Sequence, residues 1–176
     1  MTRRKAPKQQ HLDKIIIRKA RLCDVDTLVE QRHRMFQDIV SRTPESLREA
    51  DRKYKKWMIQ LWRQKRFVGF LAMNSVEVVG GGCVWIKDLQ PSPTSWRNLK
   101  SPYLLSMYTD PKYRRRGIAS SIVKEAMLWS RKKGYNHMTL HASKLGRPVY
   151  SRLGWRRSWE MIVKLPTINR KIRNRR

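Results

Sequence analysis

The chain has 176 residues, of which 40% are apolar, and this is enough to form the core of one domain. It carries 41 Lys and Arg against 13 Asp and Glu, a net charge of +28, whereas small soluble domains usually have about 2 to 8 in magnitude. No segment has the roughly 18 to 20 apolar residues of a membrane helix, and no apolar stretch follows the basic N-terminus. We therefore expect a soluble, cytoplasmic protein.

One domain between two basic tails is predicted. Residues 1–13 and 166–176 are basic and lack sustained periodicity, which is typical of mobile tails, so the domain is expected to span residues 14–165. Cys23 and Cys83 have neither metal-ligand spacing nor a disulfide framework around them. We expect both to be small core residues, and we expect no metal site.

The first third of the chain predicts one strand and two helices. A β-branched run indicates a strand over residues 14–18, and Asp24 can cap the helix that follows. Thr43 followed by Pro44 is typical of the start of a second helix. The apolar residues of this helix recur at spacings of three and four, which indicates core packing, and one flank of the stripe could border a ligand pocket: Leu47, Ala50, Tyr54, Trp57, Met58, Leu61 and Trp62.

A hairpin is predicted in the middle of the chain. Residues 66–73 and 76–87 have the composition of strands on either side of a tight turn at Asn74 and Ser75. Glycines 80–82 interrupt the second strand, which indicates a β-bulge or a close backbone approach. A phosphate cradle is disfavoured there because no helix begins after the glycines.

The next segment predicts a strand, a basic turn and a helix. Residues 103–109 are apolar enough for a central strand, and the helix that begins after Gly117 ends at Gly134. A helix N-terminus presents unpaired N–H groups and the positive end of the helix dipole, so the turn could hold a phosphate. Gly117 allows close approach, and Ala119 keeps the first helical turn free of bulk. A strand, a short helix and a last strand containing Glu160 complete the predicted mixed α/β order.

Two stretches resemble motifs of one enzyme family. Residues 105–119, L-S-M-Y-T-D-P-K-Y-R-R-R-G-I-A, resemble motif A of the GNAT superfamily of N-acetyltransferases, in which Q/R-x-x-G-x-G/A follows V-x-P. Thr109 stands where Val is usual. Residues 146–155, G-R-P-V-Y-S-R-L-G-W, resemble the later motif of a Tyr followed by x-x-x-Gly-Phe, with Trp155 in place of Phe. With the opening strand and helices in family order, the resemblance covers roughly residues 14–165.

The resemblance implies a single-domain α/β fold with a mixed, mostly antiparallel sheet flanked by helices. The sheet would splay after a bulge in the strand ending at Thr109, so that acetyl-CoA could insert its pantetheine beside the backbone of Met107, Tyr108 and Thr109. Ser143 is a further expected cofactor contact. The resemblance also implies that backbone amides of the turn hold the pyrophosphate, those of Arg114, Arg115, Arg116, Gly117, Ile118, Ala119 and Ser120.

Acyl transfer from a thioester to an amine needs a neutral amine, a donor for the developing oxyanion and an acid for the leaving thiolate. The resemblance implies that Tyr150 is the acid, and packing beside the pantetheine is the alternative role. The amides near Met107 to Thr109 are natural oxyanion donors. The base stays open among water and several scattered side chains: Glu30, Asp38, Asp88, Glu160, His33, His137 and His141.

The expected activity is therefore transfer of the acetyl group of acetyl-CoA to a primary amine in a ternary complex. The acceptor is not specified, although the net charge of +28 favours neutral or anionic amines, or amines on a nucleoprotein, over free polyamines. The same charge could give nonspecific binding to nucleic acid. The alternatives are a nucleic-acid or ribosome-binding protein and a charge-engineered scaffold that retain the fold, and a homodimer is left open.

Overall fold

The computed structural model describes residues 14–93 and 99–163, and the predicted tails lie outside these ranges. The described chain forms a sheet of order β1-β2-β3-β4-β5, in which all neighbouring strands are antiparallel except β4 and β5. No helix in these two ranges is long and apolar enough to cross a membrane. The elements are β1 (Ile16–Lys19), η1 (Leu22–Asp24), α1 (Val25–Ile39), α2 (Pro44–Arg63), β2 (Phe67–Met73), β3 (Val78–Asp88), β4 (Lys100–Thr109), η2 (Pro111–Tyr113), α3 (Ile118–Lys132), β5 (Thr139–Leu140) and α4 (Arg147–Arg152).

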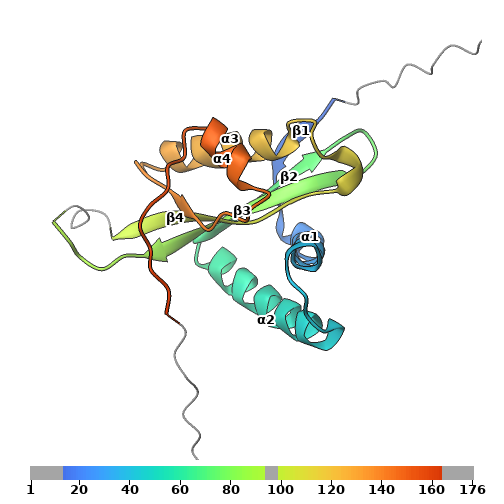
Figure 1. Cartoon of the computed structure of the whole chain (residues 1–176), viewed down its shortest axis with the longest axis horizontal. Helices are drawn as coiled ribbons and strands as arrows, with labels where there is room; N and C mark the ends of the chain where they lie inside the picture. The colour runs from blue at the N-terminus through green and yellow to red at the C-terminus, as the bar shows by residue number, and fades with distance from the viewer. Residues whose placement is uncertain (1–13, 94–98, 164–176) are drawn as a thin grey trace, which may run out of the picture.

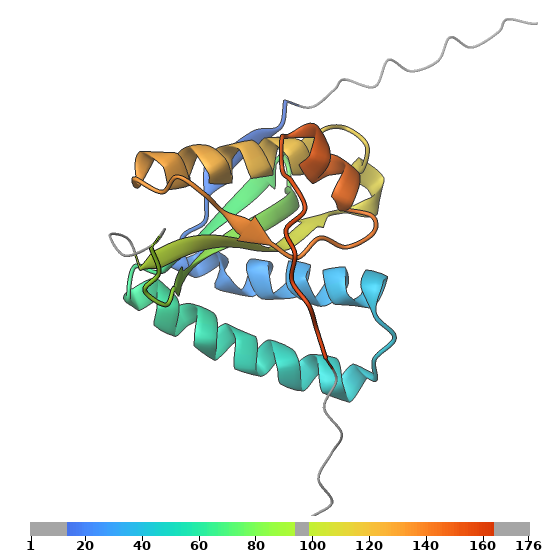
Figure 2. The same cartoon turned by 60° about the vertical axis from the view of Figure 1, so that its left-hand side comes forward.

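Helices cover both faces of the sheet, with α1 and α2 on one side and α3 and α4 on the other (Figures 1 and 2). Successive side chains of a strand point to opposite faces. In β2, Phe70 and Ala72 pack in the cluster beneath α3, whereas Phe67 and Leu71 pack in the cluster beneath α1 and α2. The continuous apolar run of β2 is therefore explained by burial on both faces, and the expected α/β fold class is confirmed.

The predicted helix starts are found, but the two caps work differently. Thr43 Oγ1 accepts a hydrogen bond from the Ser46 backbone N–H at 3.3 Å, as expected of an N-cap. Asp24 occupies the N-cap position of α1 without bonding its first turn. Its carboxylate instead accepts two hydrogen bonds from the Arg18 guanidinium, at 2.7 and 2.8 Å, and one from the Arg21 backbone N–H at 2.6 Å. This cluster ties the end of β1 to the start of α1.

The predicted hairpin is present between β2 and β3. Its turn spans four residues, because Met73 pairs with Val78. The Asn74 side-chain oxygen accepts hydrogen bonds from the backbone N–H groups of Val76 and Glu77, at 2.9 and 2.7 Å. Asn74 thus holds the turn by bonding to its own loop.

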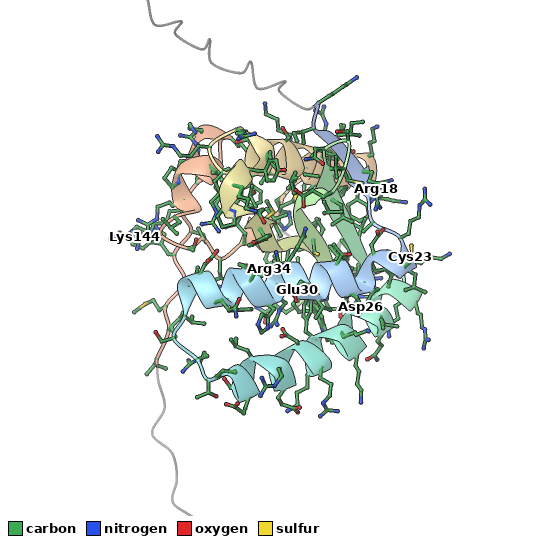
Figure 3. The ribbon with its side chains drawn as sticks, turned by 90° about the vertical axis from the view of Figure 1, so that its right-hand side faces the viewer. Arg18, Cys23, Asp26, Glu30, Arg34 and Lys144 are labelled. Atoms are coloured by element: carbon green, nitrogen blue, oxygen red, sulfur yellow. The ribbon has the colours of Figure 1, made fainter. Side chains whose placement is uncertain are left out.

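Two expectations from the sequence are wrong. The last strand does not form within the described residues, because 155–163 follow α4 without regular structure and pair with no strand (Figure 2). Its apolar side chains, from Trp159 to Val163, remain exposed. Cys83 is buried as predicted, but Cys23 is exposed because it lies in the short turn η1 before α1 (Figure 3).

The Asp24 cluster predicts a pH-dependent contribution to stability. The hydrogen bonds from Arg18 lower the pKa of the Asp24 carboxyl to about 2, below the ordinary aspartate value of about 4. The stabilisation is therefore complete above about pH 4 and is lost as the pH falls through 2. Asp24→Asn should lower the free energy of unfolding by about 1 to 2 kcal/mol at pH 7, measured by urea denaturation. The difference from wild type should shrink between pH 4 and pH 2, and a constant difference would contradict this cause.

Candidate active site

A β-bulge in β4 shapes the centre of the site. The β3–β4 register slips between Gly81 and Cys83, so that Gly82 alone faces both Ser106 and Met107. Ser106 adopts a left-handed φ of 53° at this point. The extra residue therefore belongs to β4, and the glycines supply the close approach. A Cβ atom added to Gly82 would lie 2.3 Å from the Met107 sulfur.

The sheet splays directly beside this bulge. β5 runs parallel to β4 and pairs only at Tyr103 with Thr139 and at Leu104 with Leu140. Residues 105–109 of β4 have no strand beside them on that side within the described chain. Backbone polar groups on this open side are available to an extended ligand, because such a ligand can add to a sheet edge as a strand does.

The turn that leads from β4 into α3 is open at its tip. Gly117 is the N-cap of α3, has a left-handed φ of 80° and makes no side-chain capping bond. A Cβ atom added to Gly117 would meet nothing within 4 Å. The first N–H groups of α3 have no carbonyl partner within the helix, so they and the helix dipole point into open space. This arrangement suits an anion.

The three arginines of the turn differ in their surroundings. Arg114 donates to the Thr109 carbonyl at 3.0 Å and forms an ion pair with Asp38 on α1. The Arg116 guanidinium lies 5.3 Å from the centre of the Tyr113 ring. The side chains of Arg114 and Arg116 thus contact other groups of the protein. Their positive charges still add to the positive potential of the turn.

A cavity of about 1000 Å³ connects the open side of β4 with the N-terminus of α3. Arg116 is not among its lining residues, whereas the other predicted site residues are. A second cavity, of about 870 Å³, lies at the α1–α2 connection and contains none of them. The predicted residues brought together in the first cavity are Met107, Tyr108, Thr109, Arg114, Arg115, Gly117, Ile118, Ala119, Ser120, Ser143 and Tyr150.

Tyr150 lies on α4 against the Trp155 ring, with the ring centres 5.9 Å apart. Burial and, secondly, the nearby Tyr103 raise the pKa of Tyr150 to about 12. The phenol is therefore protonated throughout the neutral range. Ser143 lies in the loop that precedes α4. Its Oγ holds this loop by accepting a hydrogen bond from the Gly146 backbone N–H at 3.1 Å.

Most of the side chains considered as bases lie away from the cavity. Glu30 pairs with Arg34 along the exposed side of α1 (Figure 3), and Asp88 pairs with Arg66. His33 bonds to Asp51 of α2. These groups are engaged in structural contacts, which leaves two of the named candidates to consider in the cavity wall.

Asp38 and His141 are those two candidates. Asp38 is occupied by Arg114. His141 bonds to the Tyr103 hydroxyl through Nδ1 and to the Glu160 carboxylate through Nε2, at 3.1 Å for the latter. The exposed segment after α4 therefore places Glu160 beside His141, although this segment forms no strand. The described residues contain no cluster of three or more His, Cys, Asp or Glu that could hold a metal ion.

Aromatic side chains outside the predicted set of site residues also line the cavity. Trp85 comes from β3 and Tyr103 from β4, whereas Tyr54 and Trp57 come from the apolar stripe of α2. The only signal in the sequence was that one flank of this stripe could border a pocket. The Tyr54 hydroxyl and Ser106 Oγ share a hydrogen bond of 3.1 Å, which connects α2 to the bulge.

Comparison with known proteins agrees with this geometry. The family model described as the acetyltransferase (GNAT) family matches residues 32–155. The chain therefore belongs to the GNAT family of acetyltransferases, a family of acyltransferases. It is 26% identical over 109 residues to the uncharacterized N-acetyltransferase YafP of Escherichia coli K12, a match that covers 60% of this chain and 64% of that protein.

Solved structures share the fold. A GCN5-related N-acetyltransferase from Ralstonia eutropha superposes with a TM-score of 0.78 at 23% identity, over 86% of this chain and 99% of the other. A predicted acetyltransferase from Clostridium acetobutylicum, solved with acetyl-CoA, superposes with a TM-score of 0.75 at 24% identity, over 86% and 96% of the two chains. At these identities the likeness establishes the fold.

Proposed function

We propose that this protein is an N-acetyltransferase that moves the acetyl group of acetyl-CoA directly to a primary amine in a ternary complex. The observation that carries the proposal is the single cavity that joins the open side of β4 to the N-terminus of α3. An extended amide chain suits the first surface and a pyrophosphate suits the second. Coenzyme A combines both groups, and membership of the GNAT family supports the proposal.

In this proposal the backbone of residues 107–109 pairs with the pantetheine, and the amides of residues 114–120 hold the pyrophosphate. Acetyl-CoA supplies the acetyl group as an activated thioester. The left-handed Gly117 and the uncapped start of α3 support the assignment. The Arg114 side chain contributes charge from its fixed position against Asp38, and Ser143 faces the cavity as a further polar contact.

Tyr150 is proposed to assist the leaving thiolate. Burial keeps its hydroxyl protonated, since the pKa of Tyr150 is raised to about 12. A thiol has an ordinary pKa of about 8.5, so complete proton transfer from this phenol would be uphill. The hydroxyl therefore acts mainly by donating a hydrogen bond to the sulfur as the carbon–sulfur bond breaks, and the amides beside the bulge stabilise the oxyanion.

His141 is proposed to receive the proton that the amine loses through the Tyr103 hydroxyl: the Tyr103 oxygen takes the amine proton as its own proton moves to His141 Nδ1. His141 lines the cavity together with Tyr150, and it bonds to the Tyr103 hydroxyl. Glu160 orients the ring through Nε2. A carboxylate that holds an imidazole in place is a common arrangement for a general base.

The alternative of a basic nucleic-acid-binding protein or a charge-engineered scaffold receives no support from the relatives reported above. The net charge of +28 remains compatible with attraction of the anionic cofactor at long range. The acetyltransferase is therefore the function that we propose.

Calorimetric titration at moderate salt tests the cofactor site. Acetyl-CoA should bind with a stoichiometry of one and far more tightly than ATP, with coenzyme A as a second reference. Gly117→Ala should weaken acetyl-CoA binding by about tenfold, since it strains a left-handed backbone at the anion site.

Gly134→Ala is the matched control, because Gly134 has a φ of 83° and equal space around it but lies at the far end of α3. Both variants should lose about 1 kcal/mol of stability, and only Gly117→Ala should lose affinity. Acetyl-CoA binding no tighter than ATP binding would contradict the proposed function.

Tyr150→Phe should lower kcat by about tenfold or more and leave acetyl-CoA affinity nearly unchanged, because it removes only the hydrogen bond to the leaving sulfur. Turnover is measured as thiol release with whichever of phenethylamine, spermidine or kanamycin the wild type acetylates fastest. Tyr135→Phe serves as the control, since Tyr135 packs against the core outside the cavity. Unchanged turnover in Tyr150→Phe would leave Tyr150 with a packing role.

His141→Gln should lower kcat/KM for the same amine by about tenfold to a hundredfold at pH 7, and the loss should diminish at higher pH as more of the amine arrives neutral. His137→Gln is the control, because His137 bonds to Ser101 outside the cavity. Equal effects of the two substitutions, or a loss that does not change with pH, would exclude His141 as the base.

A further inference from the structure

The cavity has a second end that the proposed cofactor contacts do not use. This end is formed by Tyr54 and Trp57 of α2, Trp85 of β3, and Tyr103 of β4. We call these four residues the aromatic wall. Tyr103 bonds to His141, and both line the cavity together with Tyr150, so the wall begins beside a group proposed to handle protons. If the proposed function is correct, the amine acceptor occupies this end.

The rings of the wall hold one another in a continuous chain. The centres of Tyr54 and Trp57 are 5.4 Å apart, those of Trp57 and Trp85 are 5.2 Å apart, and those of Trp85 and Tyr103 are 6.3 Å apart. The last two pairs meet edge to face, at 77° and 72°, a favourable geometry for aromatic contacts. Trp57, Trp85 and Tyr103 are only partly buried, so the wall offers ring surface to a ligand.

The charges around the cavity are unsuited to a polycation. Among the described lining residues, Asp38 is the only carboxylate, and Arg114 pairs with it. Four arginines line the same cavity: Arg32, Arg114, Arg115 and Arg152. An acceptor with several ammonium groups needs several carboxylates to offset its desolvation, whereas an amine that loses its one charge before reaction does not.

One polar atom of the wall has no partner. The indole Nε1 of Trp85 is buried and donates no hydrogen bond within the described chain. A buried donor without an acceptor costs about 1 to 3 kcal/mol. Because this N–H is enclosed, a ligand in the cavity meets the ring surface of Trp85 and not its donor.

We infer that the acceptor is a monoamine whose single primary amino group is carried on an aromatic body. In the transfer, the amine nitrogen forms a bond to the acetyl carbon, the carbon–sulfur bond breaks to leave coenzyme A as a thiolate that accepts a hydrogen bond from Tyr150, and the amine proton passes through the Tyr103 hydroxyl to His141 Nδ1. The flat body packs against the aromatic wall, which positions the nitrogen near Tyr103 and the reacting groups.

The inference is tested by comparing acceptors on the full-length protein with saturating acetyl-CoA. The probes are phenethylamine and tryptamine as aromatic monoamines, cyclohexylethylamine as a non-aromatic monoamine, and spermidine and kanamycin as polycations. The aromatic monoamines should exceed the polycations by at least about tenfold in kcat/KM, and cyclohexylethylamine should fall between them.

Trp57→Leu should raise the KM for phenethylamine by about tenfold while acetyl-CoA affinity stays unchanged. Trp62→Leu is the matched control: Trp62 lies on the same helix against Phe67 but does not line the cavity, and its substitution should leave this KM unchanged. Trp57→Phe, which keeps a ring, should restore most of the loss and separates recognition from misfolding.

The outcomes distinguish this inference from the proposed function. Normal acetyl-CoA binding with spermidine or kanamycin as the preferred acceptor overturns the aromatic acceptor and leaves the acetyltransferase standing. Normal acetyl-CoA binding with no amine of the set acetylated also overturns it. Failure of acetyl-CoA to bind better than ATP removes the proposed function itself, and the inference with it.

Discussion

The short parallel pairing of β4 with β5 is the constraint on which the site depends. It ends at Leu104, and the bulge at Ser106 follows directly, so that residues 105–109 continue without a strand beside them on that side within the described chain. Enclosed backbone groups need hydrogen-bond partners, and no described strand supplies them here. The start of α3 and the residues of α4 border the same opening. The unpaired side of β4 is thus available as a binding surface, and residues of the helices on both faces of the sheet line the cavity around it.

Features determined by neighbouring residues could be predicted from the sequence. Thr43 caps α2 through a bond to a residue three positions away, and Gly117 permits the turn before α3 because it lacks a side chain. The sequence indicated that one flank of the α2 stripe could border a pocket, which Tyr54 and Trp57 do. It could not show that Trp85 and Tyr103 complete the aromatic wall, because these residues meet α2 only in the folded chain. The last strand, expected around Glu160, was predicted wrongly for the same kind of reason, because the local sequence cannot show whether a partner strand lies beside it. The bounds of the domain and the cytoplasmic location remain predictions.

The positive charge is organised differently inside the cavity and at a distance. The net charge of +28 can attract phosphates from several sides. Within the cavity, however, two of the four lining arginines, Arg32 and Arg114, are held by carboxylates or rings. Arg32 bonds to Asp51 at 3.2 Å while its guanidinium lies 4.2 Å from the centre of the Tyr54 ring. Such arginines are fixed parts of the cavity lining, so the net charge attracts anionic ligands at long range and the fixed geometry of the cavity selects among them.

The burial of Cys83 makes the reactivity of its thiol a measure of local opening between α2 and the sheet. Cys83 lies behind Tyr54 in the core beneath α2, and burial raises the pKa of its thiol to about 12. Thiol reagents attack the thiolate, so the exposed Cys23 is modified first, and Cys83 reacts only when α2 lifts from the sheet. The rate of the second modification therefore measures how often the aromatic wall comes apart, and a ligand that bridges α2 and the sheet would slow it.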